Sequence, residues 1–279
     1  MKSFSTTIPK SNIDSLAIGS FDGIHLAHQE LIKRLSSNGA LLVIDKKSAN
    51  LTPKDRRAYY SKHPCFYCDF EKIKDLSGKE FVDYLKSEFA NLKKIVVGYD
   101  FSFGKNRANS ANDLKEFFDG SVEIVEEFKI DGLSVHSSTI RELLKSGEIK
   151  KANKLLGRQY CLSGKVIRGQ GLGKKELVPT INLEVSDYLL PKSGVYATKT
   201  KVKDKIFDSV SFIGIRVSTD GKFSVETHLL TDDEIAPSSS IEICFFEYLR
   251  ENKKFESLNE LKEQIEKDII RVKECLKNG

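Results

Sequence analysis

Several features that mark particular protein classes are scarce in this chain of 279 residues. It has no tryptophan, one methionine and five cysteines, and it contains no apolar run of the length that spans a membrane. Residues 1–12 lack the apolar core of a signal peptide. These absences argue against a membrane protein and against a disulfide-stabilised secreted scaffold, and they predict a cytoplasmic protein.

The five cysteines are an odd number scattered along the chain, which favours reduced thiols over a disulfide framework. Cys65 and Cys68 form a C-x-x-C pattern shortly after His63. Because no second pair of metal ligands follows this pattern, we expect a loop with incidental thiols and not a zinc site.

The charge balance favours small anionic ligands. Apolar residues make up 39% and charged residues 30% of the sequence, as in a soluble globular protein. The formal net charge is +5, and basic residues are mixed with acidic ones along the chain. We therefore expect no nucleic-acid partner. The length allows two domains of ordinary size.

The first half of the sequence alternates short apolar runs with segments of helical periodicity. Phe81, Leu85 and Phe89 repeat every four residues, as on the apolar face of a helix. The predicted strands are residues 16–18, 40–45, 94–98 and 122–125, and the predicted helices are residues 81–89, 110–118, 140–146 and 149–156. This alternation predicts a Rossmann-like α/β domain with a parallel sheet, helices on both faces and ligands at the carboxyl ends of the strands.

The second half has a different pattern. Turn residues separate β-branched and aromatic runs at residues 162–167, 180–185, 194–202, 207–215, 223–230 and 240–246. Such spacing predicts a compact antiparallel β-barrel. An apolar stripe along residues 258–276 predicts a C-terminal helix that packs against the barrel. The predicted domains are residues 1–157 and 158–279.

The most informative segment is residues 18–32, where an apolar run leads into Gly19 and Gly23 and a helical pattern then begins. Glycines allow the backbone to approach a phosphate, and a helix N-terminus directs N–H groups toward it. His25 and His28 lie three residues apart, so both imidazoles face the same way on the first helical turn. The segment resembles the signature of the HxGH nucleotidyltransferases, in the form typical of FAD synthetases.

Two further segments extend this resemblance. Residues 96–105 join a strand to a loop rich in aromatic side chains, as at the flavin site of that family. Ser137, Ser138 and Arg141 open a predicted helix, and they resemble the family's motif for the triphosphate tail, where hydroxyls donate hydrogen bonds and an arginine clamps phosphate. The flavin contacts that the resemblance implies are Asp100, Phe101 and Phe103.

The resemblance implies that the phosphate of FMN attacks the α-phosphorus of ATP and releases pyrophosphate. It implies His25 and His28 as catalytic residues. The ATP contacts that it implies are Gly19, Phe21, Asp22, Gly23, His25, His28, Ser137, Ser138 and Arg141.

The second half carries its own motifs. Residues 169–174 are a glycine-rich segment with a lysine that can fold over phosphates, and Thr180 and Asn182 follow on one face of a predicted strand. Their hydroxyl and amide oxygens are hard ligands, which suit Mg²⁺. The P-T-x-N run, together with Glu226 in an E-x-H-L-L segment, resembles riboflavin kinases, in which the glutamate is the general base. We interpret His228 as structural.

This second resemblance implies Glu226 as a catalytic residue and Mg²⁺ as the cofactor. It implies that ATP is bound by Gly171, Gly173, Lys174, Thr180 and Asn182, the metal by Thr180 and Asn182, and the flavin by Glu226 and Arg250.

Together the motifs run from residue 18 to residue 268 in the order of the bacterial bifunctional riboflavin kinase/FAD synthetases. The implied substrates are riboflavin, FMN and ATP; the sequence names no partner protein. One alternative is a riboflavin kinase with a weakened first domain, because Ala27 replaces the family's glycine and Ser102 its usual arginine, while Lys105 and Arg107 supply charge nearby. The serine motif is also shifted by one residue, so that His136 stands where the family usually has serine.

A second alternative is a flavin- or nucleotide-binding regulator without catalysis. Thr180, Asn182 and Glu226 argue against it, because a binding protein has no need of a base beside metal ligands.

Overall fold

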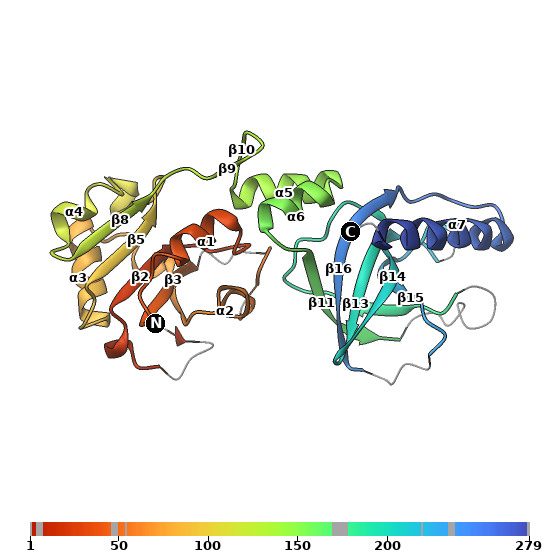
Figure 1. Ribbon diagram of the computed structural model, residues 1–279, viewed down its shortest axis with the longest axis horizontal. Helices are drawn as coiled ribbons and strands as arrows, with labels where there is room; N and C mark the ends of the chain where they lie inside the picture. The colour runs from red at the N-terminus through yellow and green to blue at the C-terminus, as the bar shows by residue number, and fades with distance from the viewer. Residues whose placement is uncertain are drawn as a thin grey trace. The chain divides into compact units, whose positions relative to one another are not determined.

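The computed structural model of the protein describes residues 2–3, 8–45, 50–53, 55–168, 178–218, 220–233 and 238–277. The chain divides into two compact units, Met1–Thr139 and Ile140–Gly279 (Figure 1). No helix in these residues combines the length and the apolar character that crossing a membrane requires.

The first unit is built on a six-stranded sheet. Its strands lie in the order β1 (Lys2–Ser3), β4 (Cys65–Asp69), β3 (Gly39–Asp45), β2 (Ser15–Gly19), β5 (Lys94–Gly98) and β8 (Ser121–Val125). All neighbours are parallel except β1, which pairs antiparallel with β4. The predicted parallel sheet is confirmed, and its central strands are apolar runs because both faces are covered.

Helices cover the two faces of this sheet. On one face, α3 (Gly78–Glu88) and α4 (Leu114–Phe117) pack against a core that contains Leu16 and Ile18. On the other, α1 (Leu26–Ile32) and α2 (Arg56–Ser61) pack against a core that contains Ala17. Successive residues of β2 therefore serve opposite faces, as the period of a strand requires.

Short elements link these layers. They are β6 (Ser102–Phe103), β7 (Asn109–Ser110), β9 (Lys129–Ile130), β10 (Leu133–Ser134) and the 3₁₀ turns η1 (Lys10–Asn12), η2 (Phe70–Lys72) and η3 (Lys105–Arg107). The prediction of a helix over residues 110–118 was wrong for most of its length, because residues 109–110 form β7 and only Leu114–Phe117 is helical. Asp113 accepts the backbone N–H of Ser110 at 2.6 Å, and this turn takes the place of a first helical turn.

Helices α5 (Ser137–Ser146) and α6 (Ile149–Leu156) lead into the barrel. The Asn153 side chain donates to the carbonyl of Phe245 at 2.8 Å, so α6 is fixed to the barrel wall. Packing thus divides the chain between residues 139 and 140, whereas the boundary between residues 157 and 158 stays a prediction about domain organisation. Gly157 ends α6 at a φ of 71°, a left-handed conformation that glycine adopts readily.

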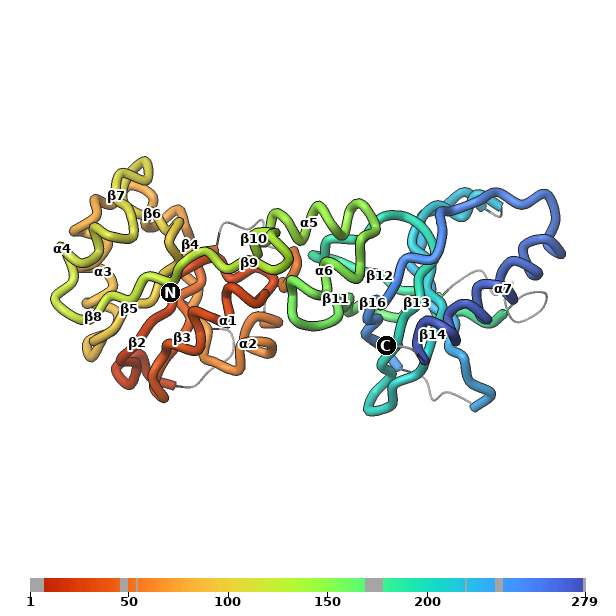
Figure 2. The backbone as a smooth tube through the Cα atoms, turned by 45° about the horizontal axis from the view of Figure 1, so that its top comes forward, coloured from red at the N-terminus to blue at the C-terminus, as the bar shows by residue number. Residues whose placement is uncertain are grey.

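The second unit is a closed antiparallel barrel, as predicted (Figure 2). Its strands follow the order β11 (Tyr160–Ile167), β12 (Ile181–Glu184), β15 (Phe223–Leu229), β14 (Lys205–Ile215), β13 (Gly194–Val202) and β16 (Ser240–Arg250). The C-terminal helix α7 (Leu258–Lys277) packs Val272 and Leu276 against Val195, Ala197 and Leu249. The predicted packing face of this helix is confirmed, although Leu258 at its start is exposed.

Five hydroxyls form a closed ring on the buried side of three barrel strands. Hydrogen bonds of 2.8–3.0 Å link Thr198, Ser209, Thr200, Thr227, Ser211 and Thr198 again. None of these side chains is more than 1% exposed. Each hydroxyl can donate one bond and accept another, so this polar patch lies in the barrel without an unsatisfied group.

The cysteines correct two predictions. Cys161 on β11 and Cys244 on β16 are directly paired in register and form a disulfide, so the expectation of reduced thiols throughout was wrong. Cys65 and Cys68 lie on the buried strand β4, not in a loop. Burial raises the pKa of Cys65 to about 11, which keeps the thiol protonated and a poor metal ligand.

Candidate functional site

The turn between β2 and α1 is fixed by a buried carboxylate. Asp22 is 2% exposed, and it accepts the backbone N–H groups of Asn50, Leu51 and Thr52 at 2.9–3.1 Å. The Gly23 N–H donates to the Thr52 hydroxyl at 2.7 Å. Both carboxylate oxygens of Asp22 therefore accept hydrogen bonds from the backbone, and these bonds hold the turn to a segment nearly thirty residues away.

The same turn holds two bulky residues in the left-handed region. Phe21 has a φ of 49° and Ile24 a φ of 40°, on either side of Gly23 at 101°. Such conformations cost roughly 1–3 kcal/mol each for a residue with a Cβ atom. Both side chains are fully buried in the core, which offsets this cost. The backbone of the turn is therefore held in a shape that a relaxed loop would not keep.

The two predicted histidines lie together at the start of α1. His25 is the N-cap, and its Nδ1 accepts the backbone N–H of His28 at 3.3 Å. Their rings are stacked with centroids 3.6 Å apart, and the His28 ring lies 5.1 Å from that of Phe21. A Cβ atom built on Gly19 would meet nothing closer than the Phe21 ring at 3.5 Å. Packing alone thus does not demand glycine there.

A second predicted motif joins this turn. The Ser137 hydroxyl donates to the backbone carbonyl of Asp22 at 2.6 Å, and so connects segments 115 residues apart. Ser138 is exposed next to it. His136 lies 3.2 Å from the Tyr99 hydroxyl. Arg141 follows on α5, half-buried, in the part of that helix that belongs to the second unit.

The aromatic loop after β5 is divided between core and surface. Phe103 is 5% exposed and packs on Phe81, so its ring belongs mainly to the core. Phe101 is half-buried and stacks on Phe103 with centroids 5.7 Å apart, while Asp100 is exposed. Of the two predicted aromatic contacts, Phe101 is the better placed to meet a ligand.

Arg107 places its guanidinium beside Ser102, the residue that stands where the resembled family usually has arginine. Its Nε donates to the Ser102 hydroxyl at 2.6 Å. Asn106 and Arg107 both have left-handed backbones, with φ of 57° and 59°, and these fold the chain back toward Ser102. The expectation that nearby residues supply charge at this point agrees with that geometry.

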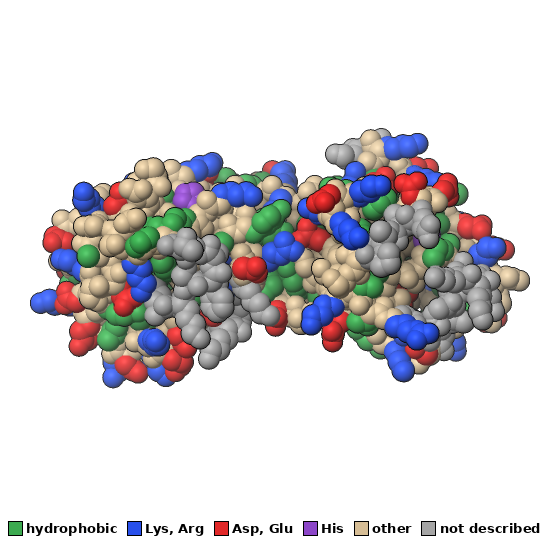
Figure 3. Space-filling view, turned by 90° about the horizontal axis from the view of Figure 1, so that it is seen from below, with side chains coloured by type: hydrophobic (Ala, Val, Ile, Leu, Met, Phe, Trp, Pro, Cys, Tyr) green, Lys and Arg blue, Asp and Glu red, His purple; other side chains and the backbone are tan. Residues whose placement is uncertain are grey.

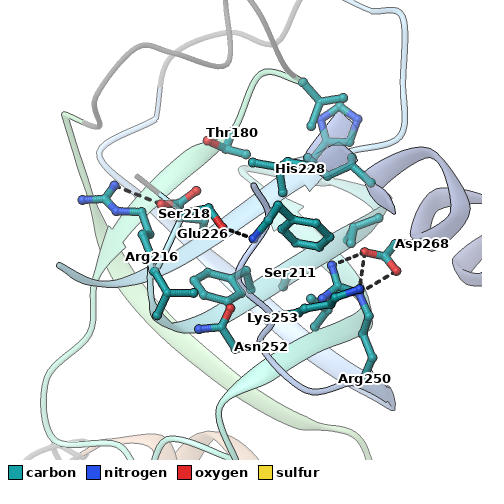
Figure 4. A pocket seen from close by; sticks show the side chains of 18 of the residues that line it. Thr180, Ser211, Arg216, Ser218, Glu226, His228, Arg250, Asn252, Lys253 and Asp268 are labelled. Carbon is teal, nitrogen blue, oxygen red and sulfur yellow. Dashed lines mark hydrogen bonds and ion pairs between the residues drawn. The ribbon is translucent and has the colours of Figure 1, made fainter. Parts of the chain in front are cut away.

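The second unit contains a cavity of about 190 Å³ between the barrel and α7 (Figure 4). Its apolar wall includes Val195, Val210, Phe212, Leu261 and Ile265. Its polar wall includes Thr180, Asn182, Arg216, Glu226 and Arg250. The structure thus brings together four predicted residues and adds Arg216, which the sequence analysis missed.

Sheet register places the central pair. Asn182 on β12 lies directly opposite Glu226 on β15, and both face the cavity. Thr180 is two residues before Asn182, so it shares the same face. Arg216 Nη1 donates to Glu226 Oε1 at 3.1 Å, and both side chains are 17% exposed. Because Arg216 ends a strand in a region with no recognised motif, nothing in the sequence singled it out.

A second cavity, of about 450 Å³, adjoins the first. Asn182 and Arg216 line both cavities, and Arg168 and Lys222 add positive charge to the second. The Ser224 hydroxyl lines it too, is buried and has no hydrogen-bond partner among the described residues. Glu184 and Asp220 line this cavity as well, so its three basic side chains exceed its carboxylates by one. An excess of basic groups beside an unused hydroxyl suits an anionic ligand.

Two further predicted residues have structural contacts. Arg250 is forked onto Asp268 of α7, with distances of 2.7–3.0 Å. His228 Nδ1 lies 2.7 Å from the carbonyl of Pro179, in keeping with its structural interpretation. The predicted ATP contacts Gly171, Gly173 and Lys174 lie outside the described residues.

Comparisons with known proteins match both units. A family model for FAD synthetase matches residues 40–139, and one for riboflavin kinase matches residues 156–276. A crystal structure of a Streptococcus pneumoniae protein described as a macrolide-efflux protein has a TM-score of 0.83 and 26% identity, covering 97% of this chain and 95% of that one.

Curated relatives match along almost their whole length. A bifunctional riboflavin kinase/FMN adenylyltransferase of Listeria monocytogenes is 31% identical, covering 91% of this chain and 89% of its own. Proteins of the same description from Bacillus subtilis and Escherichia coli are 29% and 27% identical, over 91% and 93% of this chain and 89% and 91% of theirs. The chain therefore belongs to the bifunctional riboflavin kinase/FMN adenylyltransferase family, enzymes of flavin cofactor biosynthesis.

Proposed function

We propose that the second unit phosphorylates riboflavin to FMN, and that the first unit transfers AMP from ATP to FMN to give FAD. The observation that carries this proposal is the convergence of Thr180, Asn182 and Glu226 on one cavity whose other wall is apolar. An apolar slot with a few fixed polar groups is the usual form of a small-molecule site. The flavin ring occupies the apolar side, and the second cavity, where Arg168, Arg216 and Lys222 lie, takes the ATP phosphates.

In the kinase step Glu226 accepts the proton of the riboflavin hydroxyl. The hydroxyl oxygen then bonds to the γ-phosphorus of ATP, and the bond from that phosphorus to the β,γ-bridging oxygen breaks, which releases ADP. Arg216 holds one oxygen of Glu226, so the other is directed at the substrate. Catalysis of this kind is mainly positioning and charge stabilisation.

The donor set fits Mg²⁺. Thr180 and Asn182 offer neutral hard oxygens from one strand face, and Mg²⁺ commonly combines one or two protein ligands with phosphate oxygens. When bound, the ion neutralises phosphate charge. In the wider family a divalent metal is the general requirement, and Mg²⁺ is our assignment for this chain.

In the adenylyl-transfer step the FMN phosphate attacks the α-phosphorus of ATP, and pyrophosphate leaves. His25 and His28 donate hydrogen bonds to the phosphates from the start of α1. Ser137 fixes the turn through Asp22, while Ser138 and Arg141 bind the leaving pyrophosphate. Asp100 and Phe101 contact the flavin. We place both reactions in the cytoplasm.

The test is a time course with riboflavin, ATP and Mg²⁺, in which flavins are separated by chromatography, beside a reaction that starts from FMN. The parent converts riboflavin to FMN and then to FAD, and chelation of the metal stops both steps. Glu226→Gln lowers FMN formation by roughly a hundredfold or more, because a general base contributes about that much, and leaves FAD formation from FMN unchanged. His28→Ala gives the reverse pattern.

Other outcomes decide between the alternatives. FMN that accumulates without FAD identifies a kinase with a weakened first unit, and Ala27→Gly then tests the cause. Riboflavin that is bound but never converted identifies a regulator. A Glu226→Gln variant as active as the parent refutes the assigned base.

A further inference from the structure

The guanidinium of Arg216 is shared between two carboxylates. Its Nη1 donates to Glu226 Oε1 at 3.1 Å. Its Nε and Nη2 form a fork on Asp220, at 3.0 Å to Oδ1 and 2.8 Å to Oδ2. The three side chains are 17–22% exposed, and Asp220 as a whole residue lies at the surface. Six of the seven polar atoms of this Asp220–Arg216–Glu226 cluster thus bond within it, and the seventh is Glu226 Oε2.

A tight hairpin between β14 and β15 fixes this cluster. The Arg216 N–H donates to the carbonyl of Lys222 at 2.9 Å, and the Gly221 N–H donates to the carbonyl of Arg216 at 3.1 Å. Asp220 also accepts the Lys222 N–H at 3.1 Å. The backbone on both sides of the guanidinium is therefore closed by hydrogen bonds, and the fork removes rotation about its last bonds.

The cluster stands at the wall that the two cavities share. Arg216 and Asn182 line both, whereas Asp220 lines only the second cavity and Glu226 only the first. Figure 4 shows Arg216 and Glu226 together at the first cavity. A group in this place adjoins both the phosphate donor and the acceptor hydroxyl of the proposed kinase step. Its geometry consequently matters more to transfer than to binding either substrate.

The arrangement of this cluster leaves one oxygen of Glu226 able to accept a proton. Two of the three guanidinium nitrogens bond to Asp220 and the third bonds to Glu226. Two carboxylates and one guanidinium give the cluster a formal charge of −1. One oxygen of Glu226 is held while the other can accept a proton, which is the arrangement that an orienting partner gives a base.

We infer that Arg216 and Asp220 are positioning residues for phosphoryl transfer: Asp220 holds the Arg216 guanidinium, and Arg216 orients Glu226 toward the riboflavin hydroxyl. This inference rests on the proposed kinase function of Glu226. Asp220 acts only through Arg216, so their effects belong to one unit.

The test compares Arg216→Gln, Asp220→Asn and the double variant in the full chain. Each single variant lowers kcat for FMN formation by roughly tenfold to a hundredfold, as the loss of alignment at a reacting group does, and changes KM for riboflavin less than threefold. The double variant is no slower than Arg216→Gln, because Asp220 has nothing left to hold. Asp220→Glu restores part of the rate.

Arg34 supplies a matched control. It bridges Glu30 and Glu123 at 3.3 and 2.8 Å, so Arg34→Gln removes a similar two-carboxylate contact in the unit that does not contain the kinase residues. It leaves FMN formation unchanged. Thermal unfolding of every variant separates lost alignment from lost folding.

The outcomes separate this inference from the proposed function. If Glu226→Gln abolishes FMN formation while Asp220→Asn equals the parent, the positioning role is wrong and the proposed function stands. A rise in KM at constant kcat makes Arg216 a binding residue and also overturns the inference. If Glu226→Gln is itself fully active, the proposed base is wrong.

Discussion

Asp22 is nearly fully buried, yet its hydrogen bonds hold together the turn on which the first predicted site is built. Its carboxylate accepts three backbone N–H groups from residues 50–52 while its own carbonyl accepts the Ser137 hydroxyl. Asp22→Asn replaces one of the two acceptor oxygens by an amide N–H₂ that faces a backbone N–H, and we expect a loss of about 1–3 kcal/mol of stability because a buried donor loses its acceptor. FAD formation from FMN falls at least tenfold, since the turn that holds His25 and His28 is released, and FMN formation does not change.

The control is Asp119→Asn. Asp119 is an exposed aspartate paired with Lys86, and its replacement leaves the stability close to that of the parent, because solvent screens such a pair. Denaturant unfolding and the two separate activity assays give the answer. An Asp22→Asn variant with parental FAD formation would show that the turn does not need this carboxylate.

Some site residues could be predicted from sequence motifs, whereas others are found only from contacts in the folded structure. Thr180, Asn182 and Glu226 were predicted because each lies in a short motif that resembles riboflavin kinases. The structure places all three on one cavity. Arg216 could not be predicted, because its meaning depends on Asp220 and Glu226 being near it in space. Asp22 was interpreted as an ATP contact, since its partners at residues 50–52 are visible only after folding.

At the scale of elements, an ion pair joins α7 to the end of β16. Arg250 is 22% and Asp268 6% exposed at the side chain, and Gln264 adds a bond of 3.0 Å to the same carboxylate. Asp268→Ala leaves the guanidinium without its partner, so we expect the second unit to lose about 3 kcal/mol in urea unfolding. The double variant Arg250→Met, Asp268→Leu recovers most of that loss, because an apolar pair avoids the cost of desolvating charge.

That recovery is the decisive measurement. If the double variant is no more stable than Asp268→Ala, the ion pair itself and not the stranded charge accounts for the loss. If both variants match the parent, α7 is held by its apolar contacts alone.

The prediction of helices and strands succeeded where the spacing of apolar residues fits one kind of element. Every predicted barrel strand is present, because short β-branched runs between turn residues fit little else. The helix predicted over residues 110–118 was mostly wrong, because the Ser110–Asp113 turn breaks a pattern that composition alone leaves helical. The disulfide was missed because Cys161 and Cys244 lie 83 residues apart, and only the β11–β16 register pairs them.

At the scale of the whole molecule, each unit has its own apolar core, and charges of both signs are mixed over the face seen in Figure 3. The net charge of +5 is thus not gathered into one stripe on that face. Cores that are separate predict separate unfolding, and proteins with several domains commonly depart from a single transition. We therefore expect two thermal unfolding transitions. FMN formation is lost at the transition of the second unit, and FAD formation is lost at the transition of the first.

The disulfide gives a way to tell these transitions apart. It closes a long loop within the second unit only, so its reduction frees chain entropy in the unfolded form of that unit. We expect a thiol reductant to lower the stability of the FMN-forming unit by about 2–4 kcal/mol and to leave the FAD-forming transition in place. Cys161→Ser reproduces the shift and makes the protein insensitive to reductant, whereas Cys275→Ser, which removes a free thiol of the same unit, does neither. If reductant moves both transitions together, the two cores unfold as one cooperative body, and the division of the chain at residue 139 is not a division in stability.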